Sequence, residues 1–206
     1  MGHRALVAYE RADGRYDLHY AHWGGTDLRL VRALTPRTPF GGPDADDEWV
    51  RWLRARLAGE DPDSPTGVPT EGDADATVVN PRPRARGLAL DEILAEHLDF
   101  LSHEAFYVVH PDFAVDAFLP LWFGMDVDDP TVGNGALVGV RPPGTDGDPD
   151  AEYVRAWFQG AKRVVETLVD EGERSRTAAT DLLETVLRTW AGDDRPVEVV
   201  RQRGGA

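Results

Sequence analysis

A hairpin signal near the start of the chain constrains the fold more than any other feature of the sequence. Residues 3–9 and 16–23 are rich in β-branched and aromatic side chains, and Asp13-Gly14 lies between them. An Asp-Gly pair favours a two-residue turn, because both central positions of that turn need positive φ. We therefore expect the chain to open with two antiparallel strands.

A two-residue turn fixes which side chains of the two strands face each other. It sets Ala5 opposite His22, and since side chains alternate between the faces of a strand, His3 and His22 then share one face. His19 points to the other face. Both faces are largely apolar, which indicates that the hairpin lies inside a sheet and not at its edge.

The rest of the chain contains helical and strand patterns. The predicted helices are residues 46–58, 91–101, 148–171 and 175–191. The predicted strands are residues 104–109, 115–123, 136–141 and 197–200. Pro120 lacks a backbone donor, so we expect its strand to lie at an edge or a bulge. This order of elements predicts an α+β fold: an antiparallel or mixed sheet opened by an N-terminal β-hairpin, with about four helices packed on it.

We expect residues 1–206 to form a single domain. A chain of this length with 41% hydrophobic residues can bury a sizeable core. Residues 59–76 carry six acidic residues, three prolines and no basic residue, and this composition predicts a solvated, flexible loop. Residues 202–206 are expected to form a short disordered tail.

The charge balance indicates the environment in which the protein works. The chain has 37 acidic residues against 22 basic ones, a net charge of -15, and Lys162 is its one lysine. Concentrated salt screens the self-repulsion of such a surface. We therefore expect a salt-adapted, cytoplasmic protein of a halophile, with no signal peptide and no membrane-spanning segment. The absence of cysteine excludes disulfides, thiolate nucleophiles and Cys-ligated zinc.

The chain opens with Met-Gly-His-Arg-Ala-Leu-Val-Ala-Tyr-Glu-Arg and continues, after Asp-Gly, with Tyr16-Asp17-Leu18-His19-Tyr20-Ala21-His22-Trp23-Gly24. This opening resembles an uncharacterised protein family of halophilic archaea over about the first 25 residues. The resemblance supports the archaeal and salt-adapted interpretation. It implies no activity, cofactor or catalytic residue.

Histidines at the end of the hairpin are the candidate catalytic residues. If His3 and His22 share a face, a carboxylate from a neighbouring segment would complete a set that suits a metal ion or acid/base catalysis. Asp116 is the first candidate for this carboxylate and Asp112 the second. Such a site would make the protein a hydrolase-type enzyme. The alternative is that these histidines are hydrogen-bonded side chains of a partly buried sheet.

The same region contains candidate binding residues. Tyr20, Trp23, Arg4 and His19 lie around the end of the hairpin, and exposed Trp together with Arg is typical of protein interfaces. The chain has six tryptophans, more than a core of this size needs. Our leading hypothesis is a non-catalytic role in which this surface binds a protein partner or a small ligand, with homodimerisation as a further option. The sequence identifies no cofactor or metal, and whether the protein is an enzyme stays open.

Arg82, Arg84 and Arg86 form the one basic run of the chain. They suit either contact with an anion such as nucleic acid, or pairing with the protein's own acidic side chains. The net charge repels phosphate backbones, and concentrated salt weakens binding by counterion release. We therefore favour internal pairing and expect no nucleic-acid partner.

Overall fold

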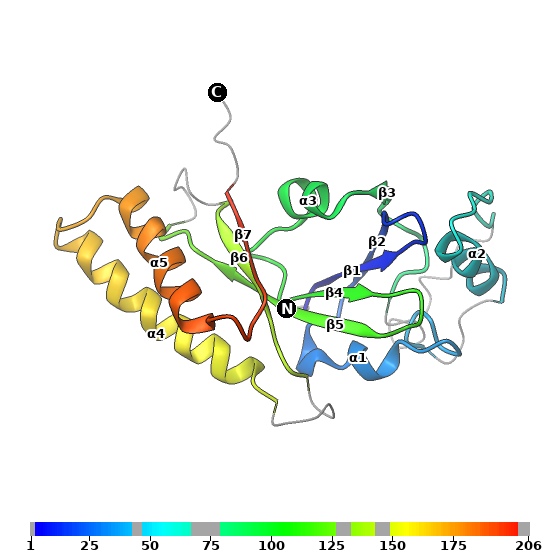
Figure 1. Ribbon diagram of the computed structural model, residues 1–206, viewed down its shortest axis with the longest axis horizontal. Helices are drawn as coiled ribbons and strands as arrows, with labels where there is room; N and C mark the ends of the chain where they lie inside the picture. Colours follow the sequence, from blue (N-terminus) through cyan, green and yellow to red (C-terminus); the bar gives the residue numbers. More distant parts are fainter. Residues whose placement is uncertain (1–2, 43–46, 67–78, 127–132, 143–148, 202–206) are drawn as a thin grey trace. The chain divides into compact units, whose positions relative to one another are not determined.

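The computed structural model describes residues 3–42, 47–66, 79–126, 133–142 and 149–201. Its strands form one mixed sheet in the order β3-β2-β1-β4-β5-β6-β7, and helices are attached to the sheet (Figure 1). The N-terminal hairpin supplies β1 and β2. The predicted α+β fold with a sheet opened by a hairpin is therefore confirmed.

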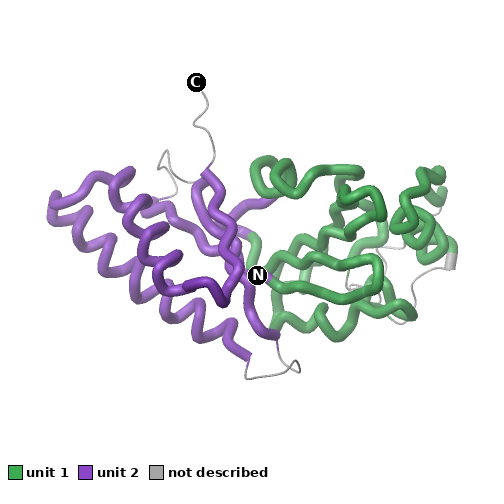
Figure 2. Tube along the Cα trace, in the orientation of Figure 1, with its two compact units in different colours: residues 1–97, 103–117 green, residues 98–102, 118–206 purple. Residues whose placement is uncertain are grey.

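The chain divides into two compact units (Figure 2). Unit 1 contains Met1–His97 and His103–Ala117, and unit 2 contains Leu98–Ser102 and Phe118–Ala206. The part of the predicted acidic loop that the structure describes, residues 59–66, contains no helix or strand. The predicted tail at residues 202–206 lies outside the described residues.

Unit 1 contains the hairpin and most of the short helices. Its strands are β1 (Ala5–Glu10), β2 (Tyr16–Ala21), β3 (Ala85–Leu88), β4 (Ala105–Val109) and the start of β5 (Val115–Trp122). Its helical segments are η1 (Thr26–Leu28), α1 (Leu30–Ala33), α2 (Asp47–Leu57), α3 (Leu90–Glu92) and the π-helical turn η2 (Ile93–His97). β1 pairs with β2 antiparallel and with β4 parallel. The sequence did not indicate β3, η1 or α1.

The hairpin register differs from the predicted one by one residue. Arg11 N–H donates to Arg15 O and Gly14 N–H donates to Arg11 O, so the loop has three residues instead of two. Gly14 has a φ of 74°, the left-handed conformation that closes three-residue hairpin loops. Ala5 consequently faces Ala21, and not His22. A slip of one residue changes which side chains of the two strands share a face of the sheet.

The core of unit 1 surrounds the three central strands. Every residue of β1 from Ala5 to Tyr9 and all of β4 are buried. His19 lies among aromatic rings on one face of the hairpin, with ring centroids 5.0 Å from Tyr9, 5.8 Å from Phe40 and 6.5 Å from Trp52. Trp52 belongs to α2, so these contacts hold α2 against the hairpin.

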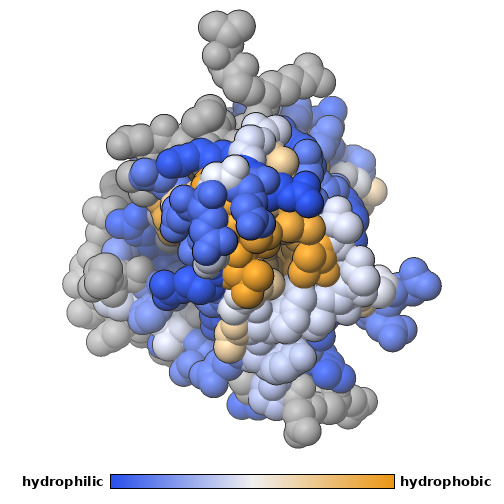
Figure 3. Space-filling view, turned by 90° about the vertical axis from the view of Figure 1, so that its left-hand side faces the viewer, coloured by the Kyte–Doolittle hydropathy of each residue, from blue (hydrophilic) through white to orange (hydrophobic). Residues whose placement is uncertain are grey.

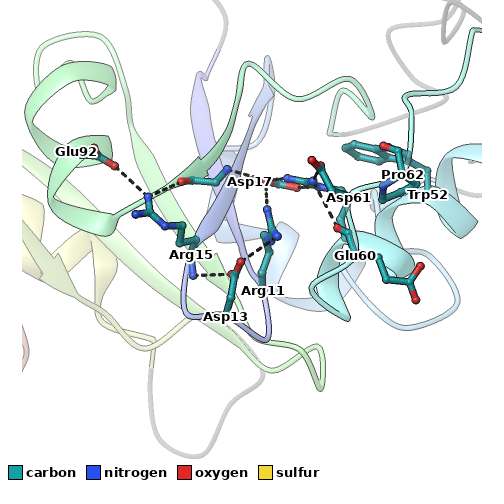
Figure 4. Close-up of polar contacts among 11 residues, drawn as sticks. Arg11, Asp13, Arg15, Asp17, Trp52, Glu60, Asp61, Pro62 and Glu92 are labelled. Atoms are coloured by element: carbon teal, nitrogen blue, oxygen red, sulfur yellow. Dashed lines mark hydrogen bonds and ion pairs between the residues drawn. The ribbon is translucent and has the colours of Figure 1, made fainter.

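A buried ion pair connects the hairpin, α2 and β3 (Figure 4). Arg56 donates from Nε to Asp17 Oδ2 at 2.6 Å and from Nη2 to Oδ1 at 2.8 Å, and both side chains are almost fully buried. Gly87 N–H donates to Asp17 Oδ1 at 2.9 Å, while Arg15 Nη1 donates to Gly87 O at 2.7 Å. Burial alone would raise the pKa of Asp17, but the hydrogen bonds from Arg56 and Gly87 outweigh it and lower that pKa.

Unit 2 contains the two long helices and the remaining strands. Its elements are β6 (Gly135–Gly139), α4 (Ala151–Asp170), α5 (Arg176–Ala191), β7 (Val197–Val200) and the rest of β5. The Ser175 hydroxyl accepts from Ala178 N–H and caps α5. β5 lies between β4 and β6, with Pro120 opposite Leu137. Of the two expected alternatives, an edge strand is wrong because β5 is internal, and the pairing with β6 continues through Pro120 without the register shift of a bulge. Proline loses one donor but keeps its carbonyl acceptor.

The one lysine of the chain is buried in unit 2. Lys162 is only 6% exposed, its Nζ donates to Trp122 O at 3.2 Å, and Nζ lies 4.0 Å from the centre of the Trp122 ring. Burial lowers the pKa of this ammonium group, and the nearby Glu166 carboxylate opposes that effect. Lys162 thus fastens α4 to β5 through a backbone carbonyl and a cation–π contact.

Apolar side chains also reach the surface of unit 2. Figure 3 shows such a patch on the side where α4 and α5 lie. Tyr153 and Val164 of α4 are 60% and 64% exposed. This face is compatible with the predicted homodimer, which stays a prediction.

Replacing Asp17 by Asn tests how much the buried ion pair contributes to the free energy of unfolding. The variant leaves the buried Arg56 guanidinium group with only the exposed Asp61 carboxylate as a counter-charge among the described residues, so we expect the free energy of unfolding at pH 7 to fall by about 3 kcal/mol. Denaturant titration followed by circular dichroism measures it. The matched control is Asp181→Asn, which removes one carboxylate from an exposed pair with Arg201 and should cost less than about 1 kcal/mol.

The pH dependence of the same pair follows from the lowered pKa of Asp17. A depressed carboxyl pKa contributes stability that is present above the unfolded value of about 4 and is lost as pH falls through the folded value. Asp17→Asn should therefore remove part of the acid sensitivity of the wild-type protein. An equal cost for Asp17→Asn and Asp181→Asn would contradict this account of the buried pair.

Candidate functional site

The segment that follows β2 is held tightly against β1 and β4. Gly25 N–H donates to His3 O at 2.8 Å, and the Tyr107 hydroxyl donates to Gly24 O at 2.7 Å. A Cβ atom on Gly24 would lie 2.6 Å from the Ala21 Cβ, and one on Gly25 would lie 2.8 Å from the Glu104 Cβ. Only glycine fits this close approach, so the position of the preceding residues is fixed by packing.

Exposed rings and a guanidinium group lie in contact with one another at this end of the hairpin. Arg84 lies 4.1 Å above the centre of the Tyr20 ring, and the Tyr20 hydroxyl shares a hydrogen bond of 3.2 Å with His22 Nδ1. The His22 ring meets the Trp23 ring edge-on at 4.9 Å, and Trp23 lies 6.2 Å from the His3 ring. We call Arg84, Tyr20, His22, Trp23 and His3 the aromatic row.

The aromatic row is accessible to a partner. Trp23 is 36% exposed, His3, His22 and Arg84 are exposed, and Tyr20 is half-buried. Trp, Tyr and Arg are the side chains that most often dominate binding energy at interfaces, because each combines a large apolar surface with a polar group. The row therefore has the chemistry of a binding surface.

The three predicted catalytic residues do not converge. His3 Nδ1 pairs with Glu104 Oε2 at 2.6 Å, His22 contacts Tyr20 and Trp23, and Asp116 pairs with His110. His3 precedes the first residue of β1, whereas Asp116 lies near Glu10 at its last. The alternative carboxylate, Asp112, accepts from Ala114 N–H in a turn.

The hairpin register explains why the predicted set is not assembled. In the observed pairing, odd-numbered residues of β1 face odd-numbered residues of β2. The pairing ends at Ala5 with Ala21, so His3 and His22 lie beyond the paired residues and are not set opposite each other. The predicted arrangement required the two-residue loop.

The four predicted binding residues divide into two groups. Tyr20 and Trp23 belong to the aromatic row, and Arg4 is exposed beside it, with its carbonyl accepting from Glu104 N–H at 2.8 Å. His19 is fully buried on the face that α2 covers. Its Nδ1 bonds to Asn80 O at 2.9 Å, and its Nε2 has no hydrogen-bond partner among the residues that the structure describes. Burial lowers the pKa of His19 to about 4, so this imidazole is neutral at pH 7.

A second polar cluster in unit 1 forms around His110, with partners that the sequence did not indicate. His110 lies between two carboxylates, with Nδ1 2.6 Å from Glu10 Oε2 and Nε2 2.9 Å from Asp116 Oδ2. The hydrogen bond to Asp116 raises the pKa of His110 most, and Glu10 adds to it against the opposing effect of burial. Because both ring nitrogens are engaged, this imidazole is a hydrogen-bonded link between β1 and β5 and not an open base. Only the parallel pairing of β1 with β4 brings Glu10 to His110.

Other parts of the described chain have less to offer a ligand. In the part of the chain that the structure describes, no group of three His, Asp or Glu side chains is arranged to hold a metal ion. Unit 2 has a hollow of about 450 Å³ where α5 ends and β7 begins. Its Arg195 already donates to Asp150 and Gly139 O, and its Arg188 to Glu184.

No helix among the described residues combines the length and apolar character of a membrane span.

A family model described as a family of unknown function (DUF6735) matches residues 1–199. The chain belongs to this family. Comparison with curated proteins and with solved structures found no match. The expected membership of an uncharacterised family is thus confirmed.

The raised pKa of His110 predicts a loss of stability in mild alkali. A histidine whose folded pKa exceeds the unfolded value contributes stability that is present below about pH 6.5 and is lost as pH rises through the folded pKa. His110 is about one-third exposed, so we expect the loss between pH 6 and pH 9 to be about 1 kcal/mol or less. Denaturation midpoints at the two pH values measure it.

His110→Gln should flatten this pH dependence, because glutamine carries no titrating charge between Glu10 and Asp116. His22→Gln is the control, since His22 contacts Tyr20 and Trp23 instead of a carboxylate. The control should keep the wild-type difference between the two midpoints. A His110→Gln protein with the full wild-type pH dependence would show that this cluster is not its source.

Proposed function

We propose that this protein has a non-catalytic role and binds a protein partner through the aromatic row of unit 1. The proposal is supported by one observation: exposed Arg84, His22, Trp23 and His3 and half-buried Tyr20 form a continuous series of contacts along the surface. Such a row offers several large side chains that lose little freedom on binding, because their neighbours already hold them.

The tryptophans support this choice of surface. Trp49 and Trp52 are buried, and Trp157 stacks on Trp190 with centroids 4.2 Å apart. Trp122 is covered by Lys162. Trp23 is the most exposed of the six, at 36%. Five of the six tryptophans thus pack within the protein, and Trp23, in the aromatic row, is the one that is exposed enough to contact a partner.

A hydrolase-type enzyme and a small-ligand protein are the alternatives. The first needs His3 and His22 to act with Asp116, whose contact is His110 instead. The second needs an enclosed site, whereas the aromatic row lies on the surface. Protein binding requires neither.

Trp23→Ala tests the proposal. Tagged full-length protein is used at high KCl to capture partners from a lysate of the source organism, and the captured proteins are quantified by mass spectrometry. A partner is then purified and its Kd measured. Because a central interface tryptophan contributes about 2 kcal/mol or more, we expect Trp23→Ala to weaken binding by roughly 30-fold.

The matched control is Tyr153→Ala, which removes a more exposed aromatic side chain from unit 2. It should leave the Kd unchanged. If Trp23→Ala binds the purified partner as tightly as wild type, or if both variants lose it equally, the aromatic row is not the binding surface. Circular dichroism of each variant separates loss of binding from loss of fold.

Salt adaptation and a cytoplasmic location are further parts of the proposal. A net charge of -15 repels itself over a Debye length that shrinks from about 10 Å at 0.1 M salt to about 3 Å at 1 M. We expect the melting temperature to rise steadily from 0.1 M to 3 M KCl. Sucrose at matched osmolality is the control for general solvent exclusion. A protein that is fully folded and soluble in dilute buffer, with no gain from KCl, would contradict salt adaptation.

A further inference from the structure

The segment that leads into β3 presents three arginines in five residues. Arg82, Arg84 and Arg86 are all exposed, and we call them the arginine strip. Their backbone is fixed: Arg84 N–H donates to Leu18 O at 2.7 Å, and Arg82 N–H donates to Asn80 Oδ1 at 2.9 Å. Pro81 and Pro83 alternate with them and restrict φ. The strip is therefore a preorganised group of cations in a chain of strong negative charge.

The arginine strip does not neutralise the protein's own acids among the residues that the structure describes. Arg84 stacks on Tyr20, and Arg86 lies 5.3 Å from the centre of the Trp52 ring and donates to the Ser64 hydroxyl. By contrast, the guanidinium groups of Arg56 and Arg195 each pair with an aspartate. The internal pairing that we expected for this run is not found in the described part of the chain.

The cation–π contact with Tyr20 orients the Arg84 guanidinium group for recognition. A guanidinium group that lies flat on an aromatic ring uses its face for that contact and keeps its N–H edge available. That edge matches the two oxygens of a carboxylate, and the resulting bidentate hydrogen bonds are charge-assisted. Because the Tyr20 ring already holds Arg84, little side-chain entropy is lost when an anion binds.

The strip is continuous with the proposed binding surface. Arg84 belongs both to the strip and to the aromatic row, and all of these residues lie in unit 1. We propose that the arginine strip binds the carboxylates of an acidic segment in the partner that the aromatic row holds. This inference rests on the proposed function and adds the chemical class of the partner.

Carboxylates fit this strip better than a nucleic-acid backbone. Nucleic-acid affinity depends largely on counterion release and falls steeply with salt. A bidentate contact with a carboxylate is a short-range interaction, which salt screens less than the long-range field.

A labelled peptide tests the strip directly. We would titrate the full-length protein into fluorescent (Glu-Ser)6 and follow anisotropy, at the lowest KCl concentration at which circular dichroism shows the folded protein. Parallel titrations use (Gln-Ser)6 and a 12-nucleotide oligo-dT. We expect the Glu peptide to bind, the Gln peptide not to bind, and the oligonucleotide to bind more weakly than the Glu peptide.

Variants assign the binding to the strip. Arg82→Ala and Arg84→Ala should each lower the affinity for the Glu peptide by about tenfold. Arg84→Lys should not restore this affinity, because an ammonium group cannot make the bidentate contact. Arg174→Ala is the matched control: it removes the same charge from an exposed position in unit 2 and should leave the affinity unchanged.

Four outcomes would overturn the inference. They are an equal loss in Arg174→Ala, equal binding of the Gln peptide, preferential binding of the oligonucleotide, and no binding of the Glu peptide at millimolar concentration. Failure of the proposed function is a separate result, because capture of a protein partner depends on Trp23. If Trp23→Ala abolishes partner binding while Arg82→Ala and Arg84→Ala do not affect it, the aromatic row is a binding surface and its partner is not recognised by carboxylates.

Discussion

The three-residue loop between β1 and β2 sets which side chains of unit 1 meet. Gly14 adopts the left-handed conformation that closes the loop, and the pairing that follows puts Asp17 and His19 on the face that α2 covers. Tyr20 is left beside Arg84 near the surface. With a two-residue loop, Asp17 would change its facing partners and its distance from Arg56. The loop thus governs both the buried ion pair and the exposed binding surface.

Both apolar packing and a buried ion pair stabilise unit 1. Aromatic packing around His19 joins α2 to the hairpin, but such packing tolerates small shifts. The Asp17–Arg56 pair does not, because its geometry is bidentate and Gly87 N–H completes it. The pair therefore specifies how β3 meets the hairpin. Since the arginine strip runs into β3, where Arg86 precedes Gly87, the buried pair also helps to orient these exposed side chains.

The sequence predicts the elements of this fold better than their contacts. Asp13-Gly14 marked the hairpin, but an Asp-Gly pair also fits a three-residue loop with glycine in its last position, so the register was wrong. β3 was missed because its Arg86 and Gly87 lack strand propensity, and its pairing depends on hydrogen bonds from distant residues. The parallel pairing of β1 with β4 joins segments about 100 residues apart, and no local pattern shows it. Consequently Glu10 and His110 were not associated, whereas Tyr20 and Trp23 were recognisable as aromatic residues at a strand end.

Lys162 has a consequence for the chemical reactivity of the whole chain. Its amine is the one side-chain amine of the protein, and it is covered by the Trp122 indole and carbonyl in unit 2. Acylating reagents and lysine-modifying enzymes therefore meet a folded surface on which the ε-amine is shielded. Any acylation of Lys162 would record that α4 had separated from β5, which makes this residue a built-in reporter of opening within unit 2.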